Sequence, residues 1–187
     1  DSEDERNEMM HLLKSVSISL DETMKHLNEV VNINTNINLV KKPLILCQYV
    51  NKVKDILSEQ ILSNDVTFIT NIPDNAVINY NSAYLESIIY NLISNAIRYK
   101  HPQRKLIVTI KLYKENDKDV FEISDNGMGI DLAKYGDKIF GMYKTFSNNP
   151  DARGIGLFIT KNQIDAMGGS ITVDSEPDEG STFKIYI

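Results

Sequence analysis

The sequence has few of the features that mark secreted and membrane proteins. Its 187 residues contain one cysteine, Cys47, which cannot form an internal disulfide and is typical of a reducing compartment. A buried structural thiol explains Cys47 better than a nucleophile does. No apolar run approaches the roughly 20 residues needed to span a bilayer, and no signal peptide is visible. We therefore expect a cytoplasmic segment without direct membrane contact.

Positive charge is also scarce. The chain has 20 Lys and Arg against 26 Asp and Glu, which gives a formal net charge of -6. This balance argues against a nucleic-acid binder, which needs a basic face to displace counterions. Apolar residues make up 42% of the chain, enough for one packed domain with an appendage. Because the first residue is Asp and not Met, we expect the chain to be a piece of a longer protein.

The first 40 residues contain no glycine and no proline. Apolar residues with heptad spacing, interrupted by Thr23 and Asn34, are Met9, Leu13, Val16, Leu20, Leu27, Val30 and Ile37. This pattern predicts a helix whose apolar stripe packs on the following domain, on a missing helix or on a second copy of the chain. The proline in "KKP" (41–43) ends the helix. We therefore divide the chain into a helix with its linker, residues 1–42, and a domain, residues 43–187.

The domain alternates between strand and helix patterns. We expect helices over residues 48–62, 81–100 and about 155–167. The expected strands are 44–47, 66–73, 76–80, 105–113, 119–124, 170–175 and 181–187. The order predicts an α+β fold, a two-layer sandwich with helices on one side of a mixed sheet. Residues 125–153 form a long loop, and a loop of this length in a small domain is usually functional.

Polar residues lie on one side of the helix expected over 81–100. They are Asn91, Asn95, Arg98 and Tyr99. Amide oxygens can ligate Mg²⁺, a guanidinium can hold a phosphate oxygen, and a phenol ring can stack on a base. A solvated helix face with incidental asparagines is the plainer alternative for this helix taken alone.

Two glycine pairs flank the long loop. Gly127 and Gly129 lie in "ISDNGMGID" (123–131), and Gly154 and Gly156 open the helix that follows "AR" at 152–153. Glycines at the start of a helix expose N–H groups to an anion. Asp125 stands beside the first pair, however, where its carboxylate would repel a phosphate.

These segments, in this order, resemble the catalytic and ATP-binding domain of sensor histidine kinases, in the superfamily shared with gyrase and heat-shock chaperone ATPases. "NLISNAIRYK" resembles the N box, "DNGMGI" the G1 box, "IFGMYKTF" the F box and "RGIGL" the G2 box. The resemblance covers residues 44–187 and implies a Bergerat-type ATP-binding fold. The chain is similar to kinases of the Bacteroides type, in which "GMYKTF" precedes "ARGIGLFITKNQI". Residues 1–42 resemble the second helix of a dimerisation and phosphotransfer hairpin.

The resemblance assigns the first glycine pair to the base. It implies that Asp125 accepts a hydrogen bond from the adenine amino group. Guanine has a carbonyl at that position, so the carboxylate selects adenine. The other residues implied to contact the base are Tyr99 by stacking, Gly127 and Gly129 by close backbone approach, Ile130 by an apolar contact and Thr182 through a water.

The second glycine pair is implied to serve the phosphates. Asn95 would ligate Mg²⁺ with the support of Asn91. The residues around the phosphates would be Arg98, Gly154, Ile155, Gly156 and Leu157. Residues 131–153 would form a lid over ATP, which Phe140 and Tyr143 anchor and from which Lys144 and Arg153 reach the γ-phosphate.

The implied function is transfer of the ATP γ-phosphoryl group to a histidine, for relay to an aspartate in the receiver domain of a response regulator, by a full-length homodimer. One departure from the family pattern is Ala152, where the G2 box usually has glycine. The other concerns the acceptor, because His11, His26 and His101 do not stand in a phosphoacceptor context. We expect the acceptor helix to lie upstream of Asp1.

Several alternatives remain at this point. Related ATPases carry a glutamate as general base where this chain has Asn91, and an amide cannot take a proton from water, so a kinase is favoured over a hydrolase. The chain could instead be a nucleotide-binding scaffold or a sensor that acts mainly as a phosphatase. A serine kinase of the anti-sigma-factor type shares the boxes but lacks the hairpin helix.

Overall fold

Residues 42–142 and 154–187 form both helices and strands, as the apolar patterns predict. The computed structural model describes residues 6–7, 9–10, 13–14, 16–17, 40–142 and 154–187. The chain divides into two units, residues 1–37 and 38–187, and each is described by itself. The second unit contains β1 (Lys42–Ile45), α2 (Leu46–Ile56), α3 (Ser58–Ser63), β2 (Thr67–Asn71), β3 (Val77–Tyr80), α4 (Ser82–Arg98), β4 (Ile107–Glu115), β5 (Lys118–Asp125), α5 (Leu132–Tyr135), the 3₁₀ helix η1 (Gly136–Lys138), α6 (Gly156–Ala166), β6 (Ser170–Glu176) and β7 (Gly180–Tyr186).

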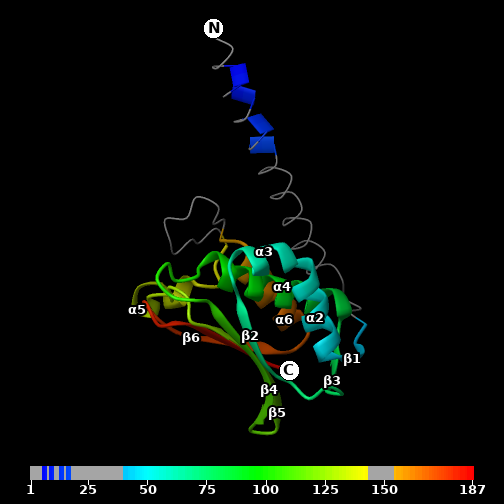
Figure 1. Ribbon diagram of the computed structural model, residues 1–187. Helices are drawn as coiled ribbons and strands as arrows, with labels where there is room; N and C mark the ends of the chain where they lie inside the picture. The colour runs from blue at the N-terminus through cyan, green and yellow to red at the C-terminus, as the bar shows by residue number, and fades with distance from the viewer. Residues whose placement is uncertain (1–5, 8, 11–12, 15, 18–39, 143–153) are drawn as a thin grey trace. The chain divides into compact units, whose positions relative to one another are not determined.

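A mixed sheet forms one layer of the domain. Its five strands lie in the order β2-β4-β5-β7-β6, and only the β2–β4 pair is parallel. Strands β1 and β3 form a separate antiparallel pair. The helices α2, α4 and α6 cover one side of the five-stranded sheet (Figure 1). The architecture confirms the predicted α+β fold with a mixed sheet.

Helix α4 packs its apolar side on the centre of that sheet. Asn81 caps the helix, because its side-chain oxygen accepts hydrogen bonds from the backbone N–H groups of Ala83 (3.1 Å) and Tyr84 (3.2 Å). The buried residues of α4 are Leu85, Ile88, Ile89, Leu92, Ile93, Ala96 and Ile97. They belong to the same core as Ile110 of β4 and Phe121 and Ile123 of β5.

The other side of the sheet is polar. Glu122 of β5 lies opposite Lys111 of β4 and Lys184 of β7. Burial would raise the pKa of Glu122, but hydrogen bonds from Lys111 (2.9 Å) and Tyr113 (2.8 Å) outweigh it and hold the pKa below its usual value. A face with such charges does not accept a second apolar helix layer, which explains the two-layer architecture.

Three expectations need correction or refinement. Leu46 and Cys47 begin α2 and are not strand, and the expected helix 48–62 is divided at Leu57 into α2 and α3. Strands β2 and β3 are neighbours in the sequence but do not pair with each other, since β2 joins β4 and β3 joins β1. The first part of the expected loop 125–153 continues β5 to Asp125 and contains α5 and η1.

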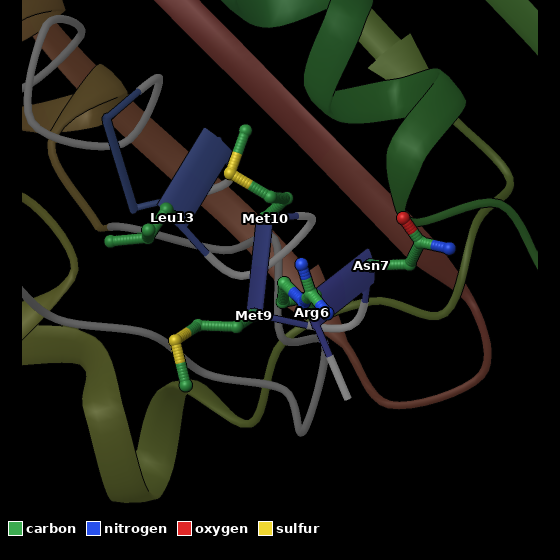
Figure 2. Close-up of a pocket in the computed structure, with 5 residues that line it drawn as sticks. All are labelled: Arg6, Asn7, Met9, Met10 and Leu13. Carbon is green, nitrogen blue, oxygen red and sulfur yellow. The ribbon is translucent and has the colours of Figure 1, made fainter. Parts of the chain in front are cut away.

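The described parts of the first unit are helical. Of the predicted heptad positions, Met9, Leu13 and Val16 are described, and all three are exposed. A hollow beside residues 6–13 is lined by Met9, Met10 and Leu13 together with Arg6 and Asn7, as Figure 2 shows. The remaining heptad positions, and His11 and His26, lie outside the described residues. No helix among the described residues has both the length and the apolar character needed to cross a membrane.

Two isoleucines on β4 test which side of the sheet holds the core. Ile110 is 0% exposed and Ile107 is 38% exposed, and the two lie on opposite faces of the strand. We expect Ile110→Ala to lower the free energy of unfolding by about 2–5 kcal/mol through the cavity it leaves, and Ile107→Ala to lower it by less than about 1 kcal/mol. Urea unfolding followed by circular dichroism measures both. Equal losses would contradict the assignment of the core to the helix side.

Candidate functional site

The polar residues of α4 lie along the end of the helix. Asn91 and Asn95 are one turn apart and half-buried, and Arg98 is exposed in the last turn. Tyr99 is the C-cap, and its backbone N–H donates to the Asn95 carbonyl at 2.9 Å. The polar side of α4 is therefore directed away from the sheet and along the edge where the two glycine segments lie.

The second glycine segment meets α4 at Asn91. A Cβ atom on Gly156, the first residue of α6, would lie 3.4 Å from Asn91 Oδ1. Asn91 Nδ2 donates to the hydroxyl oxygen of Thr160, one turn further along α6, at 3.4 Å. The buried Thr160 thus turns the amide so that its oxygen faces the start of α6. That start has Ile155 as its N-cap and no side-chain cap, and Gly154 before it has φ +65°.

The first glycine segment packs against the C-terminal end of α4. A Cβ atom on Gly127 would lie 2.6 Å from the Tyr99 carbonyl oxygen and 2.7 Å from Asp125 Oδ1, so no side chain fits there. The next residue, Met128, donates its N–H to the same Tyr99 carbonyl at 2.9 Å. The backbone of "DNGMG" is thereby fastened to the end of the helix that carries the polar residues.

Asp125 ends β5 on the helix side of the sheet, on the same face as the buried Phe121 and Ile123. Its Oδ1 accepts a hydrogen bond from the Gly127 N–H at 2.8 Å. Burial raises the pKa of the Asp125 carboxyl, and the N–H groups of Gly127 and Ser181 and the charge of Arg104 offset only part of that rise. The site therefore holds a desolvated acceptor that a hydrogen-bond donor on a ligand would stabilise.

Side chains outside the glycine pairs fix the loop that follows Asp125. Asn126 Oδ1 accepts from the Ile107 N–H at 2.8 Å, and Asn126 Nδ2 donates to the Lys105 carbonyl at 3.0 Å. The Ile130 N–H donates to the Ser175 hydroxyl at 2.8 Å, and Ser175 in turn donates to the Gly180 carbonyl at 2.7 Å. The loop is thus held from β4 on one side and from the β6–β7 hairpin on the other.

Thr182 is not brought to Asp125. In the β5–β7 ladder Thr182 pairs with Ser124, whereas Ser181 pairs with Asp125 and shares its face. Ser181 is buried, and its hydroxyl lies 3.0 Å from that of Ser175. The sequence reasoning missed both serines, although the alternation of β7, in which Phe183 and Ile185 face the core, already placed Ser181 on the helix side.

The remaining predicted residues divide into two groups. Phe140 and Leu157 are half-buried and pack against the core, and Ile155 is buried. Tyr143, Lys144 and Arg153, predicted for the lid, lie outside the described residues. Among the residues that the structure describes, no group of three or more His, Cys, Asp or Glu side chains could hold a metal ion.

The comparison with protein families decides the class. Residues 80–187, which include all of the site described above, match the family "Histidine kinase-, DNA gyrase B-, and HSP90-like ATPase". The chain belongs to this family. It carries the ATP-binding catalytic domain of the sensor histidine kinases.

Two similar proteins are sensor proteins by name, which agrees with this family. The chain is 39% identical over 108 residues to the aerobic respiration control sensor protein ArcB of Escherichia coli K12, over 55% of this chain and 14% of ArcB. It is 32% identical over 116 residues to the sensor protein RprX of Bacteroides fragilis, over 60% of this chain and 22% of RprX. The chain therefore spans less than a quarter of either relative. The fold is similar to that of the Acinetobacter baumannii histidine kinase AdeS, with a TM-score of 0.76 and 20% identity over 96% of this chain and 82% of AdeS.

Gly129 and Gly168 both have positive φ, and comparing them tests how tightly the loop after β5, residues 126–130, is built. Gly129 has φ +66°, and a Cβ atom there would overlap the Glu176 carbonyl, whereas Gly168 has φ +77° and nothing within 4 Å. We expect Gly168→Ala to lower the free energy of unfolding by about 1–2 kcal/mol, the cost of left-handed backbone for alanine. Gly129→Ala should cost about 1–3 kcal/mol beyond that, because the loop must also move. Thermal and urea unfolding measure both, and equal losses would show that the overlap relaxes freely.

Proposed function

We propose that the domain transfers the γ-phosphoryl group of Mg²⁺-bound ATP to a histidine upstream of this sequence, from which it passes to an aspartate of a response-regulator receiver domain. The observation that carries this proposal is the meeting of α4 and α6. The amide oxygen of Asn91 faces the first residue of a helix whose N-terminus has no side-chain cap. Such a helix start favours an anion, and an amide oxygen beside it favours a hard cation bound to that anion.

The adenine would lie between the end of α4 and the "DNGMG" turn. Asp125 would accept the hydrogen bond of the exocyclic amine, and Tyr99 would stack on the ring. The bare backbone at Gly127 and Gly129 would admit the base, and Ile130 would add an apolar contact. Support comes from the position of Asp125 on the helix side of the sheet and from the fixed conformation of the turn.

The phosphates would follow α4 toward α6. Asn95 would ligate Mg²⁺, Asn91 would support it, and Arg98 would bind a phosphate oxygen. The residues around the phosphate chain would be Gly154, Ile155, Gly156 and Leu157. From the lid, Lys144 and Arg153 would reach the γ-phosphate. Mg²⁺, when bound, would neutralise charge on the phosphate oxygens.

The reaction needs little proton transfer from the protein. A neutral imidazole nitrogen of the acceptor attacks the γ-phosphorus, an N–P bond forms, the bond from phosphorus to the β-phosphate oxygen breaks, and ADP leaves. Asn91, held by Thr160, cannot act as a base toward water, so the pocket positions the phosphates without activating a hydrolytic nucleophile. Positioning and charge neutralisation are what such a transfer requires of this domain.

The surroundings of the domain complete the proposal. Residues 1–42 would be the second helix of a dimerisation hairpin, and the exposed Met9, Leu13 and Val16 fit a stripe that a partner helix covers. The full-length protein would be a kinase of the Bacteroides type that forms a homodimer, with this domain in the cytoplasm. The similarity to RprX and the acidic charge support this setting over a nucleic-acid-binding one.

Phosphoryl transfer tests the proposed function directly. We expect this chain, given [γ-³²P]ATP, Mg²⁺ and the histidine-bearing hairpin of its full-length protein, to label the hairpin with acid-labile, base-stable phosphate. Asn95→Ala should abolish both the labelling and Mg²⁺-dependent ATP binding. Asn162→Ala, the same change at a half-buried position of α6 whose Nδ2 donates to the Phe158 carbonyl at 2.7 Å, should leave both unchanged. ATP binding without labelling would favour a scaffold or a phosphatase-dominant sensor instead.

Asp125→Asn is expected to have opposite effects on ATP affinity and on the stability of the free protein. Its amide oxygen can still accept from Gly127, but the loss of charge should weaken ATP binding at least about tenfold, since hydrogen bonds to charged groups contribute about 1.5–3 kcal/mol. Because burial raises the pKa of Asp125 in the folded protein, the ionised carboxylate costs stability as pH rises above the usual aspartate range. The free variant should therefore be at least as stable as the wild type at neutral pH, and the difference should vanish in acid.

Isothermal titration with ATP and thermal unfolding at several pH values measure the two effects. The control is Asp131→Asn, since Asp131 caps α5 by accepting from the Lys134 N–H at 3.0 Å, a role that asparagine fills equally well. Unchanged ATP affinity in Asp125→Asn would remove the proposed base recognition.

A further inference from the structure

Arg104 lies in none of the four sequence boxes, yet it binds the backbone of the loop that follows β5, residues 126–130. It belongs to the segment between α4 and β4. Its Nε donates to the Asn126 carbonyl at 2.6 Å, and its Nη2 donates to the Gly127 carbonyl at 2.8 Å. The same Nη2 donates to the carbonyl of Asp178, in the turn between β6 and β7. One guanidinium thus joins two loops that are more than 50 residues apart in the sequence.

The carbonyl of Asn126 and the N–H of Gly127 belong to one peptide group. Arg104 binds the oxygen end of this group, and Asp125 Oδ1 accepts a hydrogen bond from its N–H end at 2.8 Å. In a trans peptide the two ends point in opposite directions. Together with the N–H of Ser181, this peptide group therefore helps to fix where the Asp125 carboxylate lies, and Arg104 binds its opposite end.

The same contact acts through charge. A cation on the carbonyl polarises the peptide group, so that its N–H becomes a better donor to Asp125. Lysine could supply the charge but not the geometry, because a guanidinium offers several donors in a fixed plane whereas an ammonium is a compact point charge. A backbone hydrogen bond from Asp178 N–H to the Met128 carbonyl (2.7 Å) already joins the two loops, so Arg104 is needed for orientation more than for attachment.

We propose that Arg104 is a positioning residue for base recognition, which orients the Asn126–Gly127 peptide group so that Asp125 presents its carboxylate to the exocyclic amine of adenine. This inference rests on the proposed function. It predicts that loss of Arg104 weakens the recognition of one group on the base, and leaves the contacts to the phosphates and to the rest of the ring.

The test compares ATP with purine riboside triphosphate, which lacks only the exocyclic amine. Dissociation constants are measured by isothermal titration for the wild type, Arg104→Met and Arg104→Lys. We expect the wild type to prefer ATP. In Arg104→Met the affinity for ATP should fall about tenfold and that for the analogue less than threefold, so that most of the preference disappears. Arg104→Lys should recover only part of it.

The control is Lys105→Met, which removes the neighbouring positive charge. The Lys105 side chain pairs with Asp65 at 3.0 Å and touches neither loop through its side chain in the contacts described, so both affinities should stay at the wild-type values. Circular dichroism and thermal unfolding report whether each variant folds. If Arg104→Met does not fold, the same criteria are applied to Arg104→Lys.

The outcomes separate the two hypotheses. Wild-type protein that does not bind ATP would overturn the proposed function. Wild-type protein that binds ATP, with an unchanged preference for ATP in the Arg104 variants, would overturn only the role of Arg104. Equal losses for ATP and the analogue would also overturn it, because they would show that Arg104 supports the loops as a whole and not the recognition of the amine.

Discussion

The division of α4 into an apolar and a polar side is the constraint on which the rest of the domain depends. The apolar side fixes the helix on the sheet through Ile88, Ile89 and Leu92, so the direction of the polar side is not free. The polar side must run along the edge between helix layer and sheet. Both glycine segments meet α4 there, one at Asn91 and the other at the Tyr99 carbonyl. A rotation of α4 would expose the core and dismantle both ends of the site together.

The sequence predicted what depends on local patterns. Period-two and period-3.6 apolar spacing located the five strands of the main sheet and the helix α4. The resemblance of four short segments to the boxes of a known family predicted the ATP-binding class. What failed locally was the start of α2, because an apolar run such as "LILC" fits a buried strand and a buried helix turn equally well.

Contacts between distant segments could not be predicted in this way. The parallel pairing of β2 with β4 and the antiparallel pairing of β3 with β1 depend on which apolar faces meet, and the pattern within each segment indicates neither. The links from Ser175 to Ile130 and from Arg104 to Asp178 span 45 and 74 residues. Serine and arginine in polar segments carry no pattern that distinguishes them from solvated residues. Ser181 is the exception, since its place in an alternating strand marked its side of the sheet.

Two carboxylates of β5 have opposite electrostatic surroundings. The Asp125 carboxylate is buried and only partly compensated by Gly127, Ser181 and Arg104, so its pKa is raised and it would gain from a hydrogen-bond donor on a ligand. Glu122 lies three residues before Asp125, on the opposite face of β5. Its charge is compensated by Lys111 and Tyr113, and its pKa is lowered. Two carboxylates of one strand thus differ because one is fully paired within the protein. An incompletely paired acceptor facing the helix layer is costly unless a ligand completes it.

Where α4 meets the start of α6, the described part of the chain places an amide, Asn91, and not a carboxylate. Thr160 is buried and accepts from Asn91 Nδ2, which leaves the amide oxygen toward the start of α6. A carboxylate at this half-buried position would have to be desolvated, a cost that a neutral amide avoids. An amide also cannot take a proton from water near neutral pH, so Asn91 supplies no general base. In the proposed reaction the domain therefore contributes the positioning of the nucleotide, and the acceptor histidine contributes the nucleophile.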